Sequence, residues 1–287
     1  SYPVSLLFVD GDRQIAYSDY GPENGIPVFY VHSSMTTRIV PQTMLNALKE
    51  AGFRVLSVDR PGFGLSSSAQ GNQFEVAVDD FCRVLECLGL RNPLVIARGG
   101  AQFLLELALH KPGVLRGALL INPDPSSLAS PKRAGPLGAL KKYYLQSPWA
   151  IESMARLASK RLTKKNVTQW LMKSISSCPA DVVALSRPEV AYDYWCSVRG
   201  MAGGHISGYV SEQLVLATNP DKALTHSSWR WRILFGSQDA LHDAERASRY
   251  WAKLLPNASI GHVKDGGRLL SFSHLPLVIK ELQRLCS

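Results

Sequence analysis

Cysteine is scarce in this sequence, and the five cysteines form no Cys-x-x-Cys pair. An odd number, widely spaced over 287 residues, argues against a disulfide framework and against a structural zinc site. No cluster of histidines with carboxylates suggests another metal. We therefore predict reduced thiols, no metal and no cofactor; the cysteines are Cys82, Cys87, Cys178, Cys196 and Cys286.

Long hydrophobic runs are also missing. No stretch of about 18 apolar residues occurs, and the opening Ser1-Tyr2-Pro3-Val4 lacks the basic and apolar blocks of a secretory signal. The sequence thus predicts no transmembrane segment and a cytoplasmic location. With 46% hydrophobic residues, a chain of this size can bury roughly 75% of its unfolded surface in one large core.

Acidic residues are nearly absent from residues 131–173. This stretch holds ten Lys or Arg and one acid, Glu152, so it accounts for the whole net charge of +9. The rest of the chain is formally neutral, which argues against a nucleic-acid binder with a basic surface throughout. The stretch is either a solvated helix face or a weak contact for an acidic partner or a membrane surface. Nothing in it indicates an oligomeric state.

Short apolar runs alternate with amphipathic stretches along most of the chain. The apolar runs resemble strands covered by helices on both faces, and their rhythm predicts an α/β fold with a mostly parallel, eight-stranded sheet. Asp10-Gly11 predicts an antiparallel hairpin at the start. The predicted strands are Val4–Val9, Gln14–Ser18, Pro27–Val31, Arg54–Val58, Pro93–Ala97, Ala118–Ile121, Arg232–Phe235 and Ser259–Val263. The predicted helices are Gln42–Ala51, Phe74–Leu88, Ala101–His110, Ala244–Leu254 and Leu275–Leu285.

This alternation stops after Asp124 and resumes at Trp231. Helical periodicity without a convincing strand predicts a helical cap over residues 126–225, inserted in a core made of residues 1–125 and 226–287. Such a cap lies over the carboxyl ends of the strands, where open α/β sheets bind ligands. Its large side chains line an apolar pocket or form the core of the cap; they are Trp149, Trp170, Tyr192, Tyr194, Trp195 and Met201.

Two strings carry a family resemblance. They read VFYVHSSM over residues 28–35 and DRPGFGLS over residues 59–66. Both resemble strings of the α/β-hydrolase superfamily, His-Gly-x-Pro-Gly and Asp-Arg-Pro-Gly-x-Gly-x-Ser. The resemblance spans the chain outside the cap and implies an α/β-hydrolase fold with a helical cap.

The resemblance places the family's nucleophile elbow, Gly-x-Ser-x-Gly, after the fifth predicted strand. The sequence there reads IARGGAQ over residues 96–102, so that either Arg98 or Gly99 occupies the nucleophile position. The spacing to Lys111-Pro112 favours Arg98. Because arginine stays protonated and glycine has no side chain, serine acylation at the elbow is excluded.

The other two positions of the family's catalytic triad resemble Asp239 and Arg268. Asp239 ends the string LFGSQD, where the family has its acid, and Arg268 in KDGGRL stands where the family has its histidine. A guanidinium has no lone pair to accept a proton, so general-base catalysis from that position is lost. We expect Asp239 to lie between Arg98 and Arg268, with the surplus positive charge drawing an anionic ligand group into the cavity. The alternative is a decayed site whose arginines plug the pocket.

The resemblance also implies an oxyanion hole formed by the backbone amides of Ser34 and Gly99. Ser33 and Met35 replace the family's Gly and Pro in that loop, and His32 is favoured as a structural residue below the hole. Replacement acid–base groups are Asp124 and His205. Their alternative interpretations are a turn-forming aspartate and a histidine at a helix end; the remaining histidines carry no spacing signal.

These residues together predict an enzyme with cofactor-free, non-hydrolytic chemistry, namely a lyase, cyclase, isomerase or dehydratase. Its expected substrate is a small apolar molecule with an anionic, carbonyl or enolisable group, as in secondary metabolism. There are two alternatives. One is a non-catalytic protein that binds a small molecule, and the other is an atypical hydrolase in which Asp124 or His205 activates water.

Overall fold

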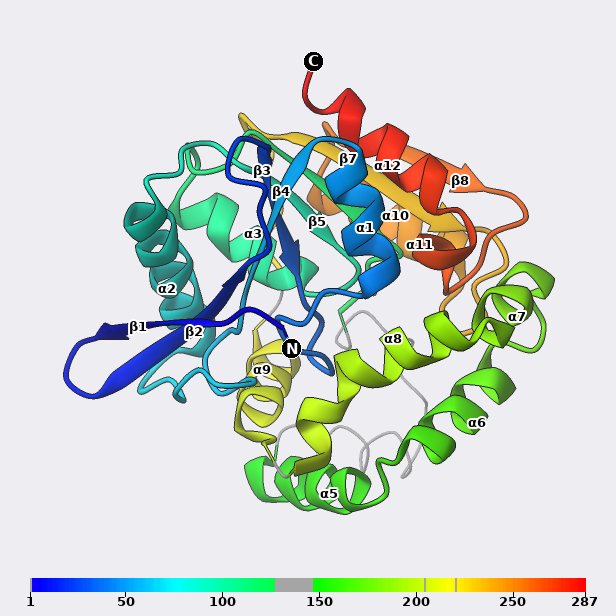
Figure 1. Cartoon of the computed structure of the whole chain (residues 1–287), viewed down its shortest axis with the longest axis horizontal. Helices are drawn as coiled ribbons and strands as arrows, with labels where there is room; N and C mark the ends of the chain where they lie inside the picture. Colours follow the sequence, from blue (N-terminus) through cyan, green and yellow to red (C-terminus); the bar gives the residue numbers. More distant parts are fainter. Residues whose placement is uncertain (1, 127–146, 204, 220) are drawn as a thin grey trace.

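The computed structural model describes residues 2–126, 147–203, 205–219 and 221–287. Within them, eight strands form one sheet in the order β1-β2-β4-β3-β5-β6-β7-β8 (Figure 1). β2 runs antiparallel to β1 and β4, whereas the other neighbours are parallel. The predicted sheet is thus confirmed. Its strands are β1 (Ser5–Val9), β2 (Arg13–Asp19), β3 (Ile26–Val31), β4 (Phe53–Val58), β5 (Leu94–Ala97), β6 (Gly117–Ile121), β7 (Arg230–Gly236) and β8 (Ser259–Val263).

Helices cover both faces of the sheet. Successive side chains of a strand point to opposite faces, so Phe29 packs in one apolar cluster and Val28 and Tyr30 pack in another. The first cluster includes residues of α2, α3 and α10, and the second includes residues of α1 and α12. The five predicted helices are confirmed to within one residue at each end: α1 (Gln42–Glu50), α2 (Gln73–Leu88), α3 (Ala101–His110), α10 (Ala244–Leu254) and α12 (Leu275–Arg284).

Between β6 and β7 the chain forms a helical insertion beside the sheet (Figure 1). A short helix that the sequence did not predict, α11 (Leu270–Ser273), follows β8 and packs against the insertion. None of the described helices is both long and apolar enough to span a bilayer. The elements of the insertion are α5 (Pro148–Lys160), α6 (Lys164–Ser174), α7 (Pro179–Ser186), α8 (Pro188–Val198), the 3-10 helix η2 (Arg199–Gly203) and α9 (Ser207–Thr218).

Three buried acids of the insertion bind the loops that follow the strands. Asp193 of α8 accepts hydrogen bonds from the amides of Gln42 and Thr43 at the start of α1. Glu212 of α9 pairs with Arg60 after β4 (2.7 Å), and Asp181 of α7 accepts from the amide of Leu269 (3.0 Å). Because these acids are at most 2% exposed, they fix the insertion at the carboxyl edge of the sheet.

Candidate functional site

The carboxyl edge of the sheet gathers charged side chains from four loops. Arg98 follows β5, Asp124 follows β6, Asp239 follows β7 and Arg268 follows β8. These four strands are parallel neighbours, so their following loops lie along one edge. Open α/β sheets bind their ligands at this edge.

Arg268 is held by two carboxylates. Its Nη1 and Nη2 donate to Asp124 Oδ1 (2.8 Å) and Oδ2 (2.9 Å), and Nη1 also donates to Asp239 Oδ2 (3.2 Å). Burial alone would lower the pKa of Arg268, but the two carboxylates raise that pKa above its ordinary value. The guanidinium therefore stays protonated and links the loops after β6, β7 and β8.

Arg98 has different surroundings. Its Cζ lies 4.7 Å from the centroid of the Phe272 ring, and no carboxylate of the described residues lies within ion-pair distance of it. The prediction that Asp239 lies between the two arginines is therefore wrong: Asp239 pairs with Arg268, and Asp124 is the second carboxylate. An aromatic face attracts a cation without neutralising it, so Arg98 keeps its positive charge uncompensated within the described part of the chain.

The turn that carries Arg98 differs from a nucleophile elbow. In the elbow the nucleophile itself sits on a sharp, strained turn, whereas here the left-handed residue is Gly100, with φ of 70°. A Cβ at Gly100 would lie 2.7 Å from the carbonyl oxygen of His32. The left-handed position thus falls on a glycine two residues after Arg98, which adopts it without strain, and Arg98 itself does not have a positive φ.

Asn122 positions the loops around Arg268, and sequence reasoning missed it. Its Nδ2 donates to the carbonyl of Gly267 (2.9 Å), and its Oδ1 accepts from the amide of Gly236 (2.8 Å). The side chain is buried, so this bridge is shielded from water. Asn122-Pro123 indicates a turn, but a single sequence carries no signal for a bridge between loops more than a hundred residues apart.

His242 is a second residue that sequence reasoning missed. Its Nε2 lies 3.3 Å from Asp124 Oδ1, and the two side chains are 40% and 44% exposed. Its Nδ1 has no hydrogen-bond partner among the described residues. In the tautomer that carries its hydrogen on Nε2, the nitrogen nearer Asp124, the lone pair of Nδ1 can accept a proton. The Asp124–His242 pair thus supplies a base that neither arginine can provide.

The segments predicted to form the oxyanion hole touch each other. A Cβ on Gly99 would lie 2.5 Å from the Cβ of Ser33. The amide of Ser33 donates to Thr36 Oγ1 (2.9 Å), and this hydrogen bond stabilises the loop after β3. The amides of Ser34 and Gly99 have no hydrogen-bond partner in the described ranges, which leaves both free to donate to a ligand.

His32 lies in the interior, below this segment. Its Nε2 accepts from the amide of Arg60 (3.1 Å), and its Nδ1 lies 2.7 Å from the carbonyl of Ser33. Burial, with the nearby charge of Arg60, holds the pKa of His32 well below its ordinary value. The ring is therefore neutral, and both of its nitrogens contact backbone groups, the amide of Arg60 and the carbonyl of Ser33.

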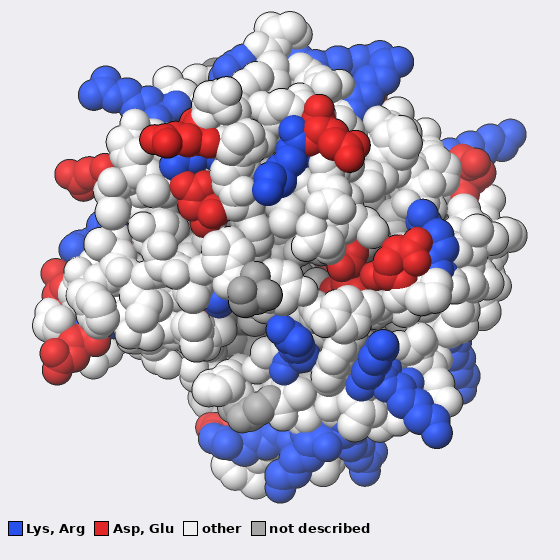
Figure 2. Space-filling view, viewed as in Figure 1, with Lys and Arg blue, Asp and Glu red and all other residues white. Residues whose placement is uncertain are grey.

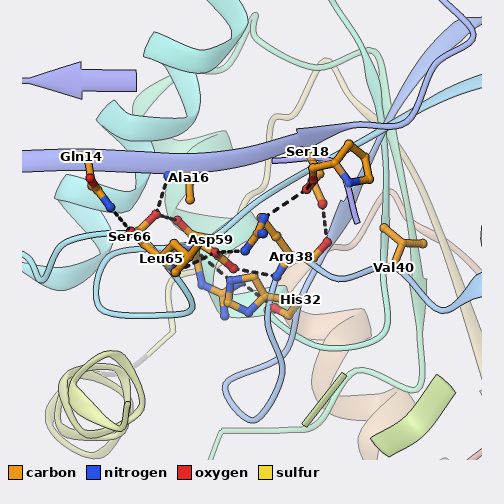
Figure 3. Close-up of polar contacts among 12 residues, drawn as sticks. Gln14, Ala16, Ser18, His32, Arg38, Val40, Asp59, Leu65 and Ser66 are labelled. Carbon is orange, nitrogen blue, oxygen red and sulfur yellow. Dashed lines mark hydrogen bonds and ion pairs between the residues drawn. The ribbon is translucent and has the colours of Figure 1, made fainter. Parts of the chain in front are cut away.

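The DRPGFGLS segment, residues 59–66, forms hydrogen bonds that stabilise the loops near His32 (Figure 3). Asp59 Oδ1 accepts from the amide of Arg38 (2.7 Å), and Oδ2 accepts from Arg38 Nη1 (2.8 Å). Ser66 Oγ donates to the carbonyl of Asp59 (2.7 Å) and accepts from the amide of Ala16 (2.9 Å). These contacts fix the loops after β3 and β4, and none of them involves the Arg268 cluster.

The insertion brings fewer residues to the site than its sequence suggested. His205 is exposed before α9 and makes no hydrogen bond or ion pair with described residues of the cluster. Trp149 and Trp170 are 74% and 61% exposed, so neither belongs to a core. Tyr194 lies near enough to Arg268 to affect its pKa. In the described ranges, no three His, Cys, Asp or Glu side chains are grouped so as to hold a metal ion.

Comparison with known sequences gives one family and several relatives. A model described as alpha/beta hydrolase fold matches residues 26–275. Non-heme chloroperoxidase CPO-A1 of Kitasatospora aureofaciens is 32% identical over 115 residues, which span 39% of this chain and 41% of that protein. The bifunctional esterase/perhydrolase DCH of Acinetobacter calcoaceticus is 24% identical over 277 residues, which span 91% of this chain and 88% of that protein.

Solved structures with the same architecture include two bacterial proteins. A probable hydrolytic enzyme of Pseudomonas aeruginosa matches with a TM-score of 0.71 and 18% identity, covering 100% of this chain and 95% of the other. The bromoperoxidase of Bacillus anthracis matches with a TM-score of 0.68 and 19% identity, covering 99% of each chain. At such low identity the likeness concerns the fold alone.

Proposed function

This chain belongs to the alpha/beta hydrolase fold family, and from that membership we propose that it is an enzyme that has exchanged hydrolysis for cofactor-free, non-hydrolytic chemistry. The reaction classes are those of a lyase, cyclase, isomerase or dehydratase. The proposed substrate is a small apolar molecule with an anionic or enolisable group. The proposed division is a core of residues 1–125 and 226–287 with a cap of residues 126–225, which includes residues outside the described ranges.

One observation carries this proposal: the cation at Arg98 has no carboxylate partner in the described part of the chain. Arg268, by contrast, is paired with both Asp124 and Asp239. An unpaired guanidinium at the carboxyl edge of the sheet is suited to bind a carboxylate or an oxyanion. The free amides of Ser34 and Gly99 add two further donors near the same turn.

The first step that we propose for such a reaction is removal of a proton next to a carbonyl group. In the proposed step, His242 Nδ1 takes the proton from the substrate carbon, and the electron pair of that C–H bond moves onto the carbonyl oxygen. Arg98 stabilises the resulting enolate, and Asp124 stabilises the imidazolium of His242. Arg268 and Asp239 act as positioning residues, since they hold Asp124 in place.

Purified protein would be incubated with apolar β-keto acids, 1,3-diketones and hydroxy acids, and the products identified by mass spectrometry. The variants are Arg98→Met and His242→Gln. The control is Arg91→Met, which removes the same charge from an exposed residue before β5, at the opposite end of that strand. We expect conversion by the wild type and the control and at least about a hundredfold loss in both site variants. Equal product formation by all four proteins, or binding without conversion, would contradict the enzymatic proposal; the latter result indicates a non-catalytic binding protein.

A second candidate function is hydrolysis by a water molecule that the Asp124–His242 pair activates. The exposure of both side chains favours it, because water reaches an exposed pair. Hydrolysis of 4-nitrophenyl acetate would then persist in Arg98→Met and disappear in His242→Gln. Loss in neither variant would exclude this base, and labelling of residues 96–102 by a fluorophosphonate would contradict the absence of a serine nucleophile.

A further inference from the structure

The helices α5 and α6 expose large apolar side chains. Trp149, Met154, Leu157 and Trp170 are 74%, 64%, 57% and 61% exposed. Single exposed apolar residues are ordinary on protein surfaces, but four within two consecutive helices form a set. We call the outer face of α5 and α6 the α5–α6 surface.

The orientation of α5 follows from what its inner face contacts. Ile151, Ala155 and Ser159 are buried, and Ser159 donates to the carbonyl of Met201 in η2. On a helix these positions share one side, and Trp149, Ser153, Leu157 and Lys160 share the opposite side. The exposed Trp and Leu therefore project away from the molecule.

Basic side chains surround the exposed apolar ones. The helices α5 and α6 and the turn between them carry six Lys or Arg and one acid, Glu152, which pairs with Arg156 (2.6 Å). Figure 2 shows Lys and Arg gathered over the lower end of the molecule, where Figure 1 places these helices, and the acids mostly elsewhere. The six are Arg156, Lys160, Arg161, Lys164, Lys165 and Lys173. Four further basic residues of the stretch, Lys132, Arg133, Lys141 and Lys142, lie outside the described residues.

We propose that the α5–α6 surface docks on an anionic lipid bilayer. Lys and Arg bind the lipid phosphates and carboxylates, while Trp and Leu enter the boundary between headgroups and acyl chains. A nucleic acid or an acidic protein would also match the charge, but an anionic bilayer combines that charge with an apolar layer that accommodates Trp149, Leu157 and Trp170 together. Such docking brings the insertion, and the sheet edge that it covers, close to molecules dissolved in the membrane.

The test uses the full chain and sedimentation with two kinds of vesicle, phosphatidylcholine alone and phosphatidylcholine with phosphatidylserine. We expect binding only to the anionic vesicles and weaker binding as salt rises. Each basic residue near an anionic bilayer strengthens binding about fivefold, so Lys160→Gln/Lys165→Gln, at two exposed positions, should bind about 25-fold more weakly. Trp149→Ser/Trp170→Ser should also bind less, whereas the control Phe8→Ser, which removes an exposed ring elsewhere, should bind as the wild type does.

Circular dichroism establishes that each variant is folded before binding is compared. Brominated phosphatidylcholine mixed with phosphatidylserine should quench wild-type tryptophan fluorescence and should quench Trp149→Ser/Trp170→Ser less. The proposal is overturned if the wild type does not bind anionic vesicles, or if the tryptophan variant binds equally well. Binding to heparin with no binding to vesicles would also overturn it, in favour of a polyanionic partner.

Discussion

Arg98 and Arg268 carry the same guanidinium, yet their neighbours give them different properties. Arg268 forms hydrogen bonds with two carboxylates, Asp124 and Asp239. These bonds connect its own loop to the loops after β6 and β7. Arg98 contacts an aromatic face and no described carboxylate. A ligand anion competes with Asp124 and Asp239 at Arg268, but it meets no such competitor in the described residues at Arg98.

Loss of the bidentate pair should destabilise the protein. In Asp124→Asn, Arg268 keeps only Asp239, and because the pair is partly exposed we expect a cost of about 1–2 kcal/mol in the free energy of unfolding. Urea unfolding followed by circular dichroism measures this cost. The control Glu245→Gln removes the partner of Arg249; the Glu245 side chain is 80% exposed, and the variant should change the free energy by less than about 0.5 kcal/mol. Equal effects of the two variants would show that the Asp124 pair contributes nothing.

His32 predicts how stability depends on pH. Its pKa in the folded protein lies well below 6.5, so below pH 6.5 the unfolded chain binds a proton that the folded protein does not. The contribution of His32 to stability is complete above the unfolded pKa and falls as pH decreases toward the folded pKa. Urea unfolding of wild type and His32→Gln between pH 5 and pH 8 measures this, with the stability difference between them shrinking as pH falls. Parallel pH profiles would contradict the neutral, buried histidine.

The residues of the site that could be predicted are those that follow a recognisable strand. Arg98, Asp124, Asp239 and Arg268 each come shortly after a predicted strand, so their shared edge follows from the parallel sheet. His242 lies in an irregular loop, and no periodicity determines where such a side chain points. Which carboxylate pairs with which arginine is decided by distances of a few ångströms between loops, and strand positions alone do not specify them.

The β5–α3 turn is the element that decides what residue 98 can do. Its left-handed position is Gly100, and the backbone there packs against the carbonyl of His32. Because a glycine takes the left-handed position, neither Arg98 nor Gly99 needs a positive φ.

Substitution of Gly100 should be more harmful than substitution of another left-handed glycine. Gly100→Ala places a methyl group 2.7 Å from a backbone oxygen, whereas Gly89, with φ of 65°, has open space around its Cβ position. We expect about 1 kcal/mol for Gly89→Ala, from backbone conformation alone, and at least about 3 kcal/mol for Gly100→Ala. Thermal unfolding of the two variants checks the order. Similar losses would show that the turn at Gly100 relaxes freely.

Among the elements, strands and core helices were predictable because their boundaries carry chemical signals. Asp10 and Gly11, both with positive φ, end β1, and Pro112 follows α3. The helices of the insertion were predictable only as a class. Their order and packing depend on buried contacts such as Glu212 with Arg60 and Asp193 with Thr43, which join positions about 150 residues apart.

At the scale of the whole molecule, the insertion and the sheet should unfold together. Asp181, Asp193 and Glu212 are buried where the two parts meet, and removal of one partner from such contacts is costly. The six tryptophans divide equally: Trp149, Trp170 and Trp195 lie in the insertion, and Trp229, Trp231 and Trp251 lie in the core. In a variant with the first three replaced by Phe, fluorescence reports only the core, while circular dichroism reports both parts.

We expect the fluorescence and circular dichroism midpoints of that variant to coincide in urea. Adding Glu212→Gln should lower both, since Arg60 then loses its buried partner. Two separated transitions in the tryptophan variant alone would contradict the single cooperative unit.

Positive charge is found at two separate places in the molecule, and we assign a different function to each. The surface excess of Lys and Arg lies on the insertion, whereas Arg98 lies at the sheet edge. Salt weakens the electrostatic interactions of exposed charges more than those of partly buried charges. Docking on vesicles should therefore be more sensitive to salt than binding of a small anion at Arg98, and this difference separates the two functions experimentally.

Calorimetric titration with an apolar carboxylate tests the role of Arg98 most directly. The matched probes are 4-phenylbutyrate and its neutral amide, added to wild type, Arg98→Met and the control Arg91→Met. We predict that wild type and control bind the carboxylate at least about tenfold more tightly than the amide, and that Arg98→Met loses this preference. A preference that persists in Arg98→Met, or its absence from the wild type, would contradict the assignment of Arg98 as the anion-binding residue.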